Sequence, residues 1–155
     1  MHLLRTISIL FIPACLVLSS CSSGKPLTPE EAFSQLREAY KSENPQTLSR
    51  LITKESLAKV HGIVNAINNM PPERKRAMAA KLQVKPSIFN SITVRDYLAL
   101  QMAIGKKQGD DPVATAVSQQ VTGIKRKNGE AIVKVQNGME LHFKKEGPYW
   151  LLVYE

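Results

Sequence analysis

Apolar residues of the segment from Thr28 to Gly105 recur three or four positions apart, the spacing typical of amphipathic helices. The longest such stripe consists of Leu57, Val60, Val64 and Ile67. Equivalent patterns predict further helices over residues 29–42, 45–52, 73–82 and 94–104. The first two thirds of the chain after residue 28 should therefore be helical.

Capping signals fix where these helices begin. Thr28 can cap the first helix, Pro29 suits its first position, and Glu31 would complete a capping box. Thr93 followed by Asp96 predicts a second such start. Gly105 is expected to end that last helix, followed by a polar loop over residues 106–112.

The pattern changes to strand after Val113. Asn128-Gly129 and Asn137-Gly138 are strong hairpin signals, and Gly147-Pro148 marks a third turn. These turns predict an antiparallel four-stranded meander over residues 116–127, 130–136, 139–145 and 149–154.

Two-residue turns would set the register of this sheet. They place Ile124 opposite Val133, and Val133 opposite His142, so His142 would share a side with these apolar residues. Both sides are partly apolar, which predicts a sheet covered on both sides, or covered on one side and lining a cavity on the other.

Residues 1–20 have a different character. Arg5 precedes an apolar run from Thr6 to Leu18, and the small residues Ser19 and Ser20 follow. This order is typical of a secretory signal peptide. The run is shorter than the roughly 20 residues that a membrane-spanning helix needs.

The segment Leu18-Ser19-Ser20-Cys21 resembles a bacterial lipobox. The resemblance implies cleavage between Ser20 and Cys21 and acylation of the Cys21 sulfur. Cys15 would leave with the signal peptide, so no intramolecular disulfide is expected. The predicted organisation is a signal peptide (1–20), a tether (21–27) and one α+β domain (28–155).

Helices followed by a terminal meander are an α+β order. The chain resembles the nuclear-transport-factor-two-like (cystatin-like, ketosteroid-isomerase-like) domains of small bacterial lipoproteins. The stretches that carry the resemblance are TPEEAFSQLREAYKSENPQTLSRLITKESLAK, MPPERKRAMAAKL and AIVKVQNGMELHFKKEGPYWLLVYE. It implies helices packed on a cone-like curved sheet with an apolar pocket, although this fold does not determine function.

The formal net charge is +8, which favours anionic neighbours such as lipid headgroups or an acidic envelope protein. Residues 73–76 and 125–127 are basic clusters that could provide such contacts. Nucleic acid is not an expected partner of an exported protein, and the basic residues lack interleaved aromatic residues.

Titratable residues offer few catalytic candidates. His142, Tyr40 and Tyr97 are the candidate ligand-binding residues, and Asp96 beside Tyr97 could imitate an isomerase site. Asp96 is more simply explained as an acid in the first turn of a helix, and Tyr97 as a core residue. His61 has no histidine or cysteine at ligand spacing, and no metal or cofactor is expected.

These observations predict a non-enzymatic, lipid-anchored accessory or binding module. It would be exported and held at the periplasmic side of the outer membrane or at the cell surface. Alternatives are a carrier of a small apolar ligand in the cone pocket and an enzyme of the isomerase or dehydratase type. The second alternative would need a titratable pair within that pocket.

Overall fold

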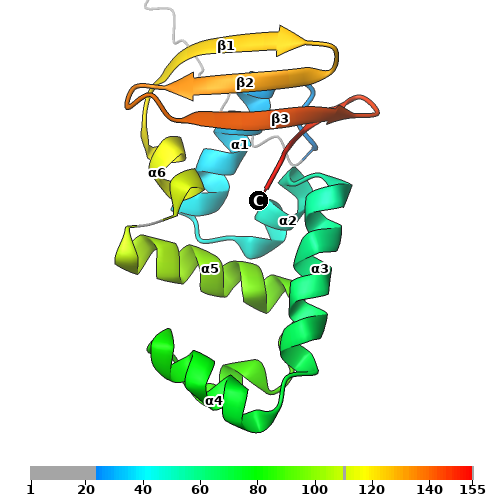
Figure 1. Cartoon of the computed structure of the whole chain (residues 1–155). Coiled ribbons are helices and arrows are strands. Elements are labelled where there is room, and N and C mark those ends of the chain that lie inside the picture. Colours follow the sequence, from blue (N-terminus) through cyan, green and yellow to red (C-terminus); the bar gives the residue numbers. More distant parts are fainter. Residues whose placement is uncertain (1–23, 110, 155) are drawn as a thin grey trace, which may run out of the picture.

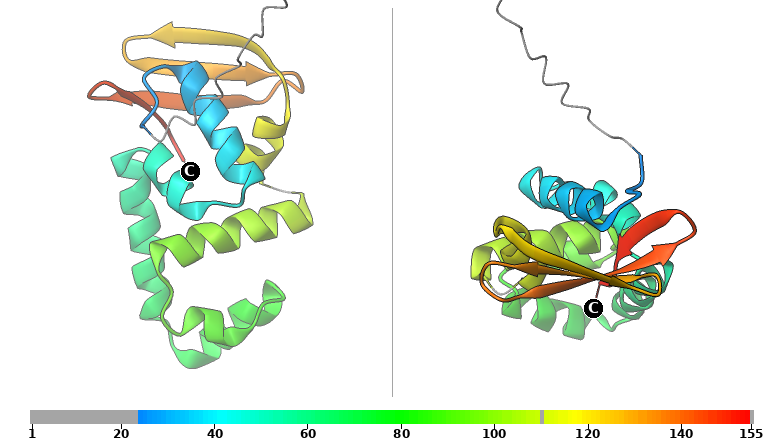
Figure 2. Two further views of the ribbon diagram at one scale, coloured as in Figure 1. Left: turned by 180° about the vertical axis from the view of Figure 1, so that it is seen from behind. Right: turned by 90° about the horizontal axis from the view of Figure 1, so that it is seen from above.

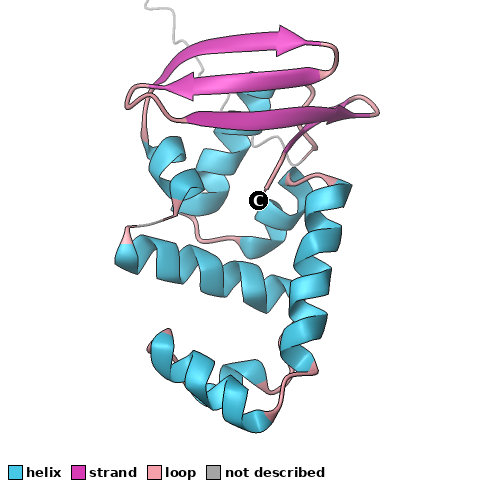
Figure 3. Cartoon of the chain, viewed as in Figure 1, coloured by secondary structure: helices cyan, strands magenta, loops and turns pink. Residues whose placement is uncertain are grey.

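The computed structural model describes residues 24–109 and 111–154. Helices precede a four-stranded antiparallel sheet of order β1-β2-β3-β4, which confirms the α+β class (Figures 1 and 3). The elements are α1 (Pro29–Lys41), α2 (Pro45–Leu51), α3 (Lys54–Asn68), α4 (Pro72–Lys81), the 3-10 turn η1 (Pro86–Phe89), α5 (Val94–Gln108), α6 (Pro112–Ser118), β1 (Val121–Lys127), β2 (Glu130–Val135), β3 (Glu140–Glu146) and β4 (Tyr149–Leu152).

The molecule has a sheet at one end and a helical half at the other. Helix α1 crosses one face of the sheet, as the view from behind shows (Figure 2). Helix α3 leads away from the sheet to α4. Helix α5 then lies between α4 and the α1–α2 layer, with α3 alongside (Figure 1). No helix of the described segments has the length and apolar character required to cross a bilayer.

The core fills the space between α1 and the sheet and continues among α2, α3, α4 and α5. On α1 the buried residues are Pro29, Ala32, Phe33, Leu36 and Ala39. The sheet contributes Ala131, Val133, Val135, Leu141, Phe143 and Leu152, each at most 6% exposed. Between them these side chains occupy the space where the cone pocket was expected.

Over β1, β2 and most of β3 the opposite face of the sheet is open, so the expectation of two apolar sides is wrong there. Leu151 of β4, which pairs with Lys144 on that side, is only 3% exposed. The exposed residues of this face are mostly charged, with Lys125, Lys127, Glu130, Lys134, Glu140, His142 and Lys144 surrounding the half-buried Ile132. An open hollow of about 970 Å³ runs over this face. We refer to it as the outer face.

The register of the first hairpin is confirmed, and that of the second is wrong by one residue. Lys127 pairs with Glu130 and Ile124 with Val133, but Val133 pairs with Leu141. The second loop has three residues, because Val135 N–H donates to the Met139 carbonyl (3.0 Å) and Gly138 has a φ of 86°. One residue of slip moves every side chain of β3 to the other face, which puts His142 outside.

Residues 106–120 also differ from the expectation of a loop and a strand. Helix α5 continues past Gly105 and ends at Gly109, whose φ of 72° is left-handed. Helix α6 then forms where strand was expected, because Asp111 caps it and Pro112 occupies its first turn. Strand β1 begins only at Val121.

The capping predictions are confirmed in part. Thr93 and Asp96 form the complete capping box of α5. At α1, Thr28 caps the helix, but the Glu31 carboxylate accepts from Leu27 N–H (2.8 Å) instead of closing the box.

Residues 24–27 lie against the folded domain. The Gln35 side chain donates to the Gly24 carbonyl (3.0 Å), and Trp150 N–H donates to the Pro26 carbonyl (2.9 Å). The Lys25 ammonium lies 5.6 Å from the centre of the Tyr149 ring. The segment expected as a tether is therefore fastened from Gly24 onward.

Candidate functional site

An open pocket of about 530 Å³, which we refer to as the cavity, lies between α1, α5 and α6. Its apolar lining comes from Met102 on α5 and from Ala114 and Val117 on α6, with Tyr40 of α1 beside them. The other lining residues are Arg37, Lys41, Glu43, Lys106, Ser118, Gln119 and Gln120. This volume is within the range of about 300–1,000 Å³ that is usual for small-ligand sites.

Arg37 builds one wall by joining α1 to the end of α6. Its guanidinium donates to the Val117 carbonyl (2.7 Å) and to the Gln119 carbonyl (2.6 Å), and it lies 4.9 Å from the centre of the Phe33 ring. Carbonyls at a helix C-terminus lack partners within the helix and attract cations. The bonds therefore fix the position of α6 relative to α1.

Charged side chains surround the mouth of the cavity. Lys106 forms an ion pair with Glu43, which connects α5 to the turn after α1. Lys41 is exposed and forms no ion pair with any residue in the described ranges. Three cations and one carboxylate line the site, so it is positively charged overall.

Tyr40, which lines the cavity, belongs to a cluster of phenols with Tyr154. The Tyr40 hydroxyl is buried, and no group within residues 24–109 and 111–154 forms a hydrogen bond of good geometry with it. Burial raises the pKa of Tyr40 well above its usual range, and the adjacent Tyr154 and Asp111 raise it further. Burial, together with Asp111 and Tyr97, raises the pKa of Tyr154 to about 12.

Asp111 has a structural duty in this cluster. Its carboxylate accepts from Val113 N–H (2.8 Å) and Ala114 N–H (3.0 Å), which caps α6. Gly105 makes room for it, because a Cβ there would lie 2.2 Å from the Asp111 Cβ. Asp111 and Tyr154 were not among the residues predicted from the sequence, although Asp111-Pro112 carries a cap-then-proline signal like that of Thr28-Pro29.

The structure does not bring the predicted ligand-binding residues together. Tyr40 lines the cavity, and Tyr97 is half-buried on α5, where burial raises its pKa. His142 lies exposed on the outer face, so its predicted place in an apolar pocket is wrong. Asp96 is exposed, and its bonds to Thr93 explain the lowering of its pKa.

The other sequence candidates are on the surface or outside the described residues. His61 is exposed, and the described part of the chain has no cluster of potential metal ligands. Arg76 pairs with Glu73 (3.3 Å), Arg126 pairs with Glu30 of α1, and only Lys125 and Lys127 of the second basic cluster are on the outer face. Ser20 and Cys21 lie outside the described residues.

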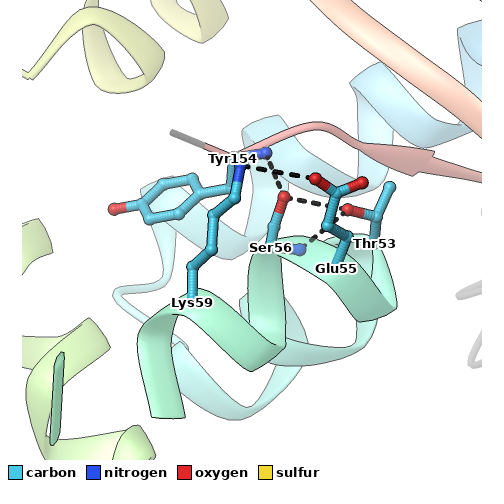
Figure 4. A network of polar contacts seen from close by, with 5 residues as sticks. All are labelled: Thr53, Glu55, Ser56, Lys59 and Tyr154. Carbon is cyan, nitrogen blue, oxygen red and sulfur yellow. Dashed lines mark hydrogen bonds and ion pairs between the residues drawn. The ribbon is translucent and has the colours of Figure 1, made fainter. Parts of the chain in front are cut away.

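A separate buried polar network joins the C-terminal segment to α3 (Figure 4). Tyr154 N–H donates to the Ser56 hydroxyl (2.9 Å), which also accepts from the Thr53 hydroxyl (2.8 Å). Thr53 N–H donates to the Leu152 carbonyl (2.9 Å). Tyr154 is thereby held where its ring joins the phenol cluster.

Comparisons with known proteins found no match to a family model, a curated protein or a solved structure.

Proposed function

We propose that the protein is a lipid-anchored module of the bacterial cell envelope, acylated at Cys21. The observation that carries this proposal is the order of Arg5, the apolar run 6–18 and the segment Leu18-Ser19-Ser20-Cys21. The buried core of the described residues lies between Ala32 and Leu152, well after the segment that we propose to be removed.

Replacing each cysteine in turn tests the anchor. Cys21→Ala should abolish incorporation of radiolabelled fatty acid and release the protein from the membrane fraction. Cys15→Ala is the matched control and should still be labelled, because Cys15 lies in the removed segment. Mass spectrometry of the wild type should find a mature chain that begins at acylated Cys21.

Label in the Cys21→Ala protein, or equal loss of label from both variants, would contradict the proposal. A mature N-terminus elsewhere in the chain would also contradict cleavage between Ser20 and Cys21.

We infer that the outer membrane, on its periplasmic side, or the cell surface is the site of residence. The lysines of the outer face support contact with anionic lipid or an acidic envelope protein. The domain acts there as an accessory or binding module.

A second candidate function is carriage of a small, mostly apolar ligand. The cavity between α1, α5 and α6 favours it, whereas the interface of α1 with the sheet is filled by side chains. Acid–base catalysis has less support, because burial moves the pKa values of Tyr40 and Tyr154 still farther above neutral pH, near which a catalytic acid or base works best. Asp111 is already engaged in capping α6.

A further inference from the structure

We propose that the cavity between α1, α5 and α6 binds an anionic amphiphile with a single hydrocarbon chain, such as a free fatty acid. This inference rests on the second candidate function and names its ligand. It follows from three properties of the cavity, namely an apolar interior, a cationic mouth and a fixed shape.

The interior suits a hydrocarbon chain. Met102 and Val117 are 4% and 3% exposed, and Ala114 and Tyr40 extend the apolar wall. Methionine adapts to irregular apolar partners because its side chain is unbranched and polarisable. An alkyl chain in this space would cover the apolar surface of Tyr40 and Ala114, which are partly exposed.

The mouth suits an anionic head. Glu43 neutralises Lys106, which leaves the charges of Lys41 and Arg37 without a carboxylate partner among the described residues. Arg37 donates hydrogen bonds to two carbonyls, which do not neutralise its positive charge. A carboxylate at the mouth would therefore meet two cations, whereas an alkylammonium head would be repelled.

The shape suits one chain and is fixed before binding. Arg37 clamps α6 to α1, and the Lys106–Glu43 pair joins α5 to the turn after α1. A volume of about 530 Å³ leads us to specify one chain instead of the two chains of a membrane phospholipid. A preformed site of this kind loses little affinity to ordering on binding.

The test uses a chain that begins at Ser22, which retains every described residue and the complete core. Decanoate, decanol and decyltrimethylammonium share one chain length and differ in head charge. Isothermal calorimetry should find the tightest binding for decanoate, weaker binding for decanol and none for the cation. Decanoate should also shift the amide NMR signals of Met102 and Val117.

Two lysine variants separate the contribution of the ligand's charged head from that of its hydrocarbon chain. Lys41→Ala should weaken decanoate binding by about fivefold, the size expected for one exposed charge pair, and leave decanol binding unchanged. Lys81→Ala removes an exposed lysine of α4 away from the cavity and should change neither. Ala114→Leu, which places extra carbon inside, should weaken both ligands, and urea unfolding checks that it still folds.

The outcomes distinguish the proposed anionic ligand from the carrier function on which the proposal rests. Equal affinity for decanoate and decanol, or an unchanged decanoate affinity in Lys41→Ala, would overturn the anionic preference and leave carriage of an apolar ligand standing. No binding of any probe would overturn the inference and the carrier function together. Neither result bears on acylation of Cys21.

Discussion

Ser56 shows how much one buried hydroxyl can hold together. It is 1% exposed, and its oxygen accepts from the Thr53 hydroxyl and from Tyr154 N–H (Figure 4). Removing that oxygen would leave the buried Thr53 hydroxyl and the part-buried Tyr154 N–H without this acceptor. An unsatisfied buried donor costs more than the net value of the hydrogen bond it has lost.

Ser56→Ala should lower the free energy of unfolding by about 1–3 kcal/mol, measured by urea denaturation. The matched control is Ser34→Ala on the exposed side of α1, which should change the free energy of unfolding by at most about 0.5 kcal/mol. Equal effects of the two substitutions would show that the network of Figure 4 contributes nothing to stability.

Residue type alone could nominate Tyr40 and His142 but could not place them. Tyr40 follows Leu36 by one helical turn on a well-predicted helix, so its approach to the interior was within reach of periodicity. The side of His142 depended on a loop one residue longer than assumed. Tyr154 and Asp111 join Tyr40 from distant parts of the chain, which no local pattern reveals.

Helices α5 and α6 illustrate how a close contact dictates sequence. Gly105 lies inside α5, where glycine is usually unfavourable, because Asp111 returns across the helix at that point. From the sequence, this glycine was expected to end the helix. Gly62 of α3 has open space around it, so the two helical glycines form a matched pair.

Gly105→Ala should destabilise the protein, because its Cβ would lie 2.2 Å from the Asp111 Cβ, and overpacking of this kind costs about 1–3 kcal/mol. Gly62→Ala should stabilise it by about 0.5–1 kcal/mol through helix propensity. Urea unfolding measures both. A stabilising Gly105→Ala would mean that Asp111 does not lie against α5.

The elements with repeated local signals were the predictable ones. Proline after a cap gave α1 and α2, and Asn128-Gly129 gave the first hairpin with its register. Asn137-Gly138 allows either a two-residue or a three-residue loop, and the choice depends on which side of β3 can be buried. Burial against α1 is a tertiary effect, so the second register could not be fixed locally.

At the scale of the whole molecule, charge and apolar surface lie on opposite sides of the sheet. The inner face is buried under α1, and the outer face carries four lysines and two glutamates with His142. Order of elements and composition were enough to predict the α+β class. They could not predict the space between α1, α5 and α6, because it depends on how three helices pack.

The buried phenols predict a loss of stability at high pH. The pKa of Tyr154 is about 12 in the folded protein against 10.0 for a free phenol, so the folded state holds the proton more tightly. The resulting stabilisation is complete below pH 10 and is lost as the pH rises towards about 12. Tyr154→Phe should therefore lose less stability across this window than the wild type, measured by urea unfolding.

Tyr40→Phe should flatten the same pH dependence, since burial also raises the pKa of Tyr40. Each variant differs from the wild type by a single phenol hydroxyl, so the comparison isolates the phenols. Parallel curves for all three proteins would contradict ionisation of these phenols as the cause.

The fastening of Gly24 to Gln35 sets the height at which an anchored domain would stand. Three residue steps separate Cys21 from Gly24, and an extended chain covers at most about 3.6 Å per residue, or about 11 Å in all. A domain joined to its lipid anchor by so short a linker would lie against the lipid headgroups. Partners would then have to bind the domain at the membrane surface. A longer linker would allow the domain to reach partners farther from the membrane.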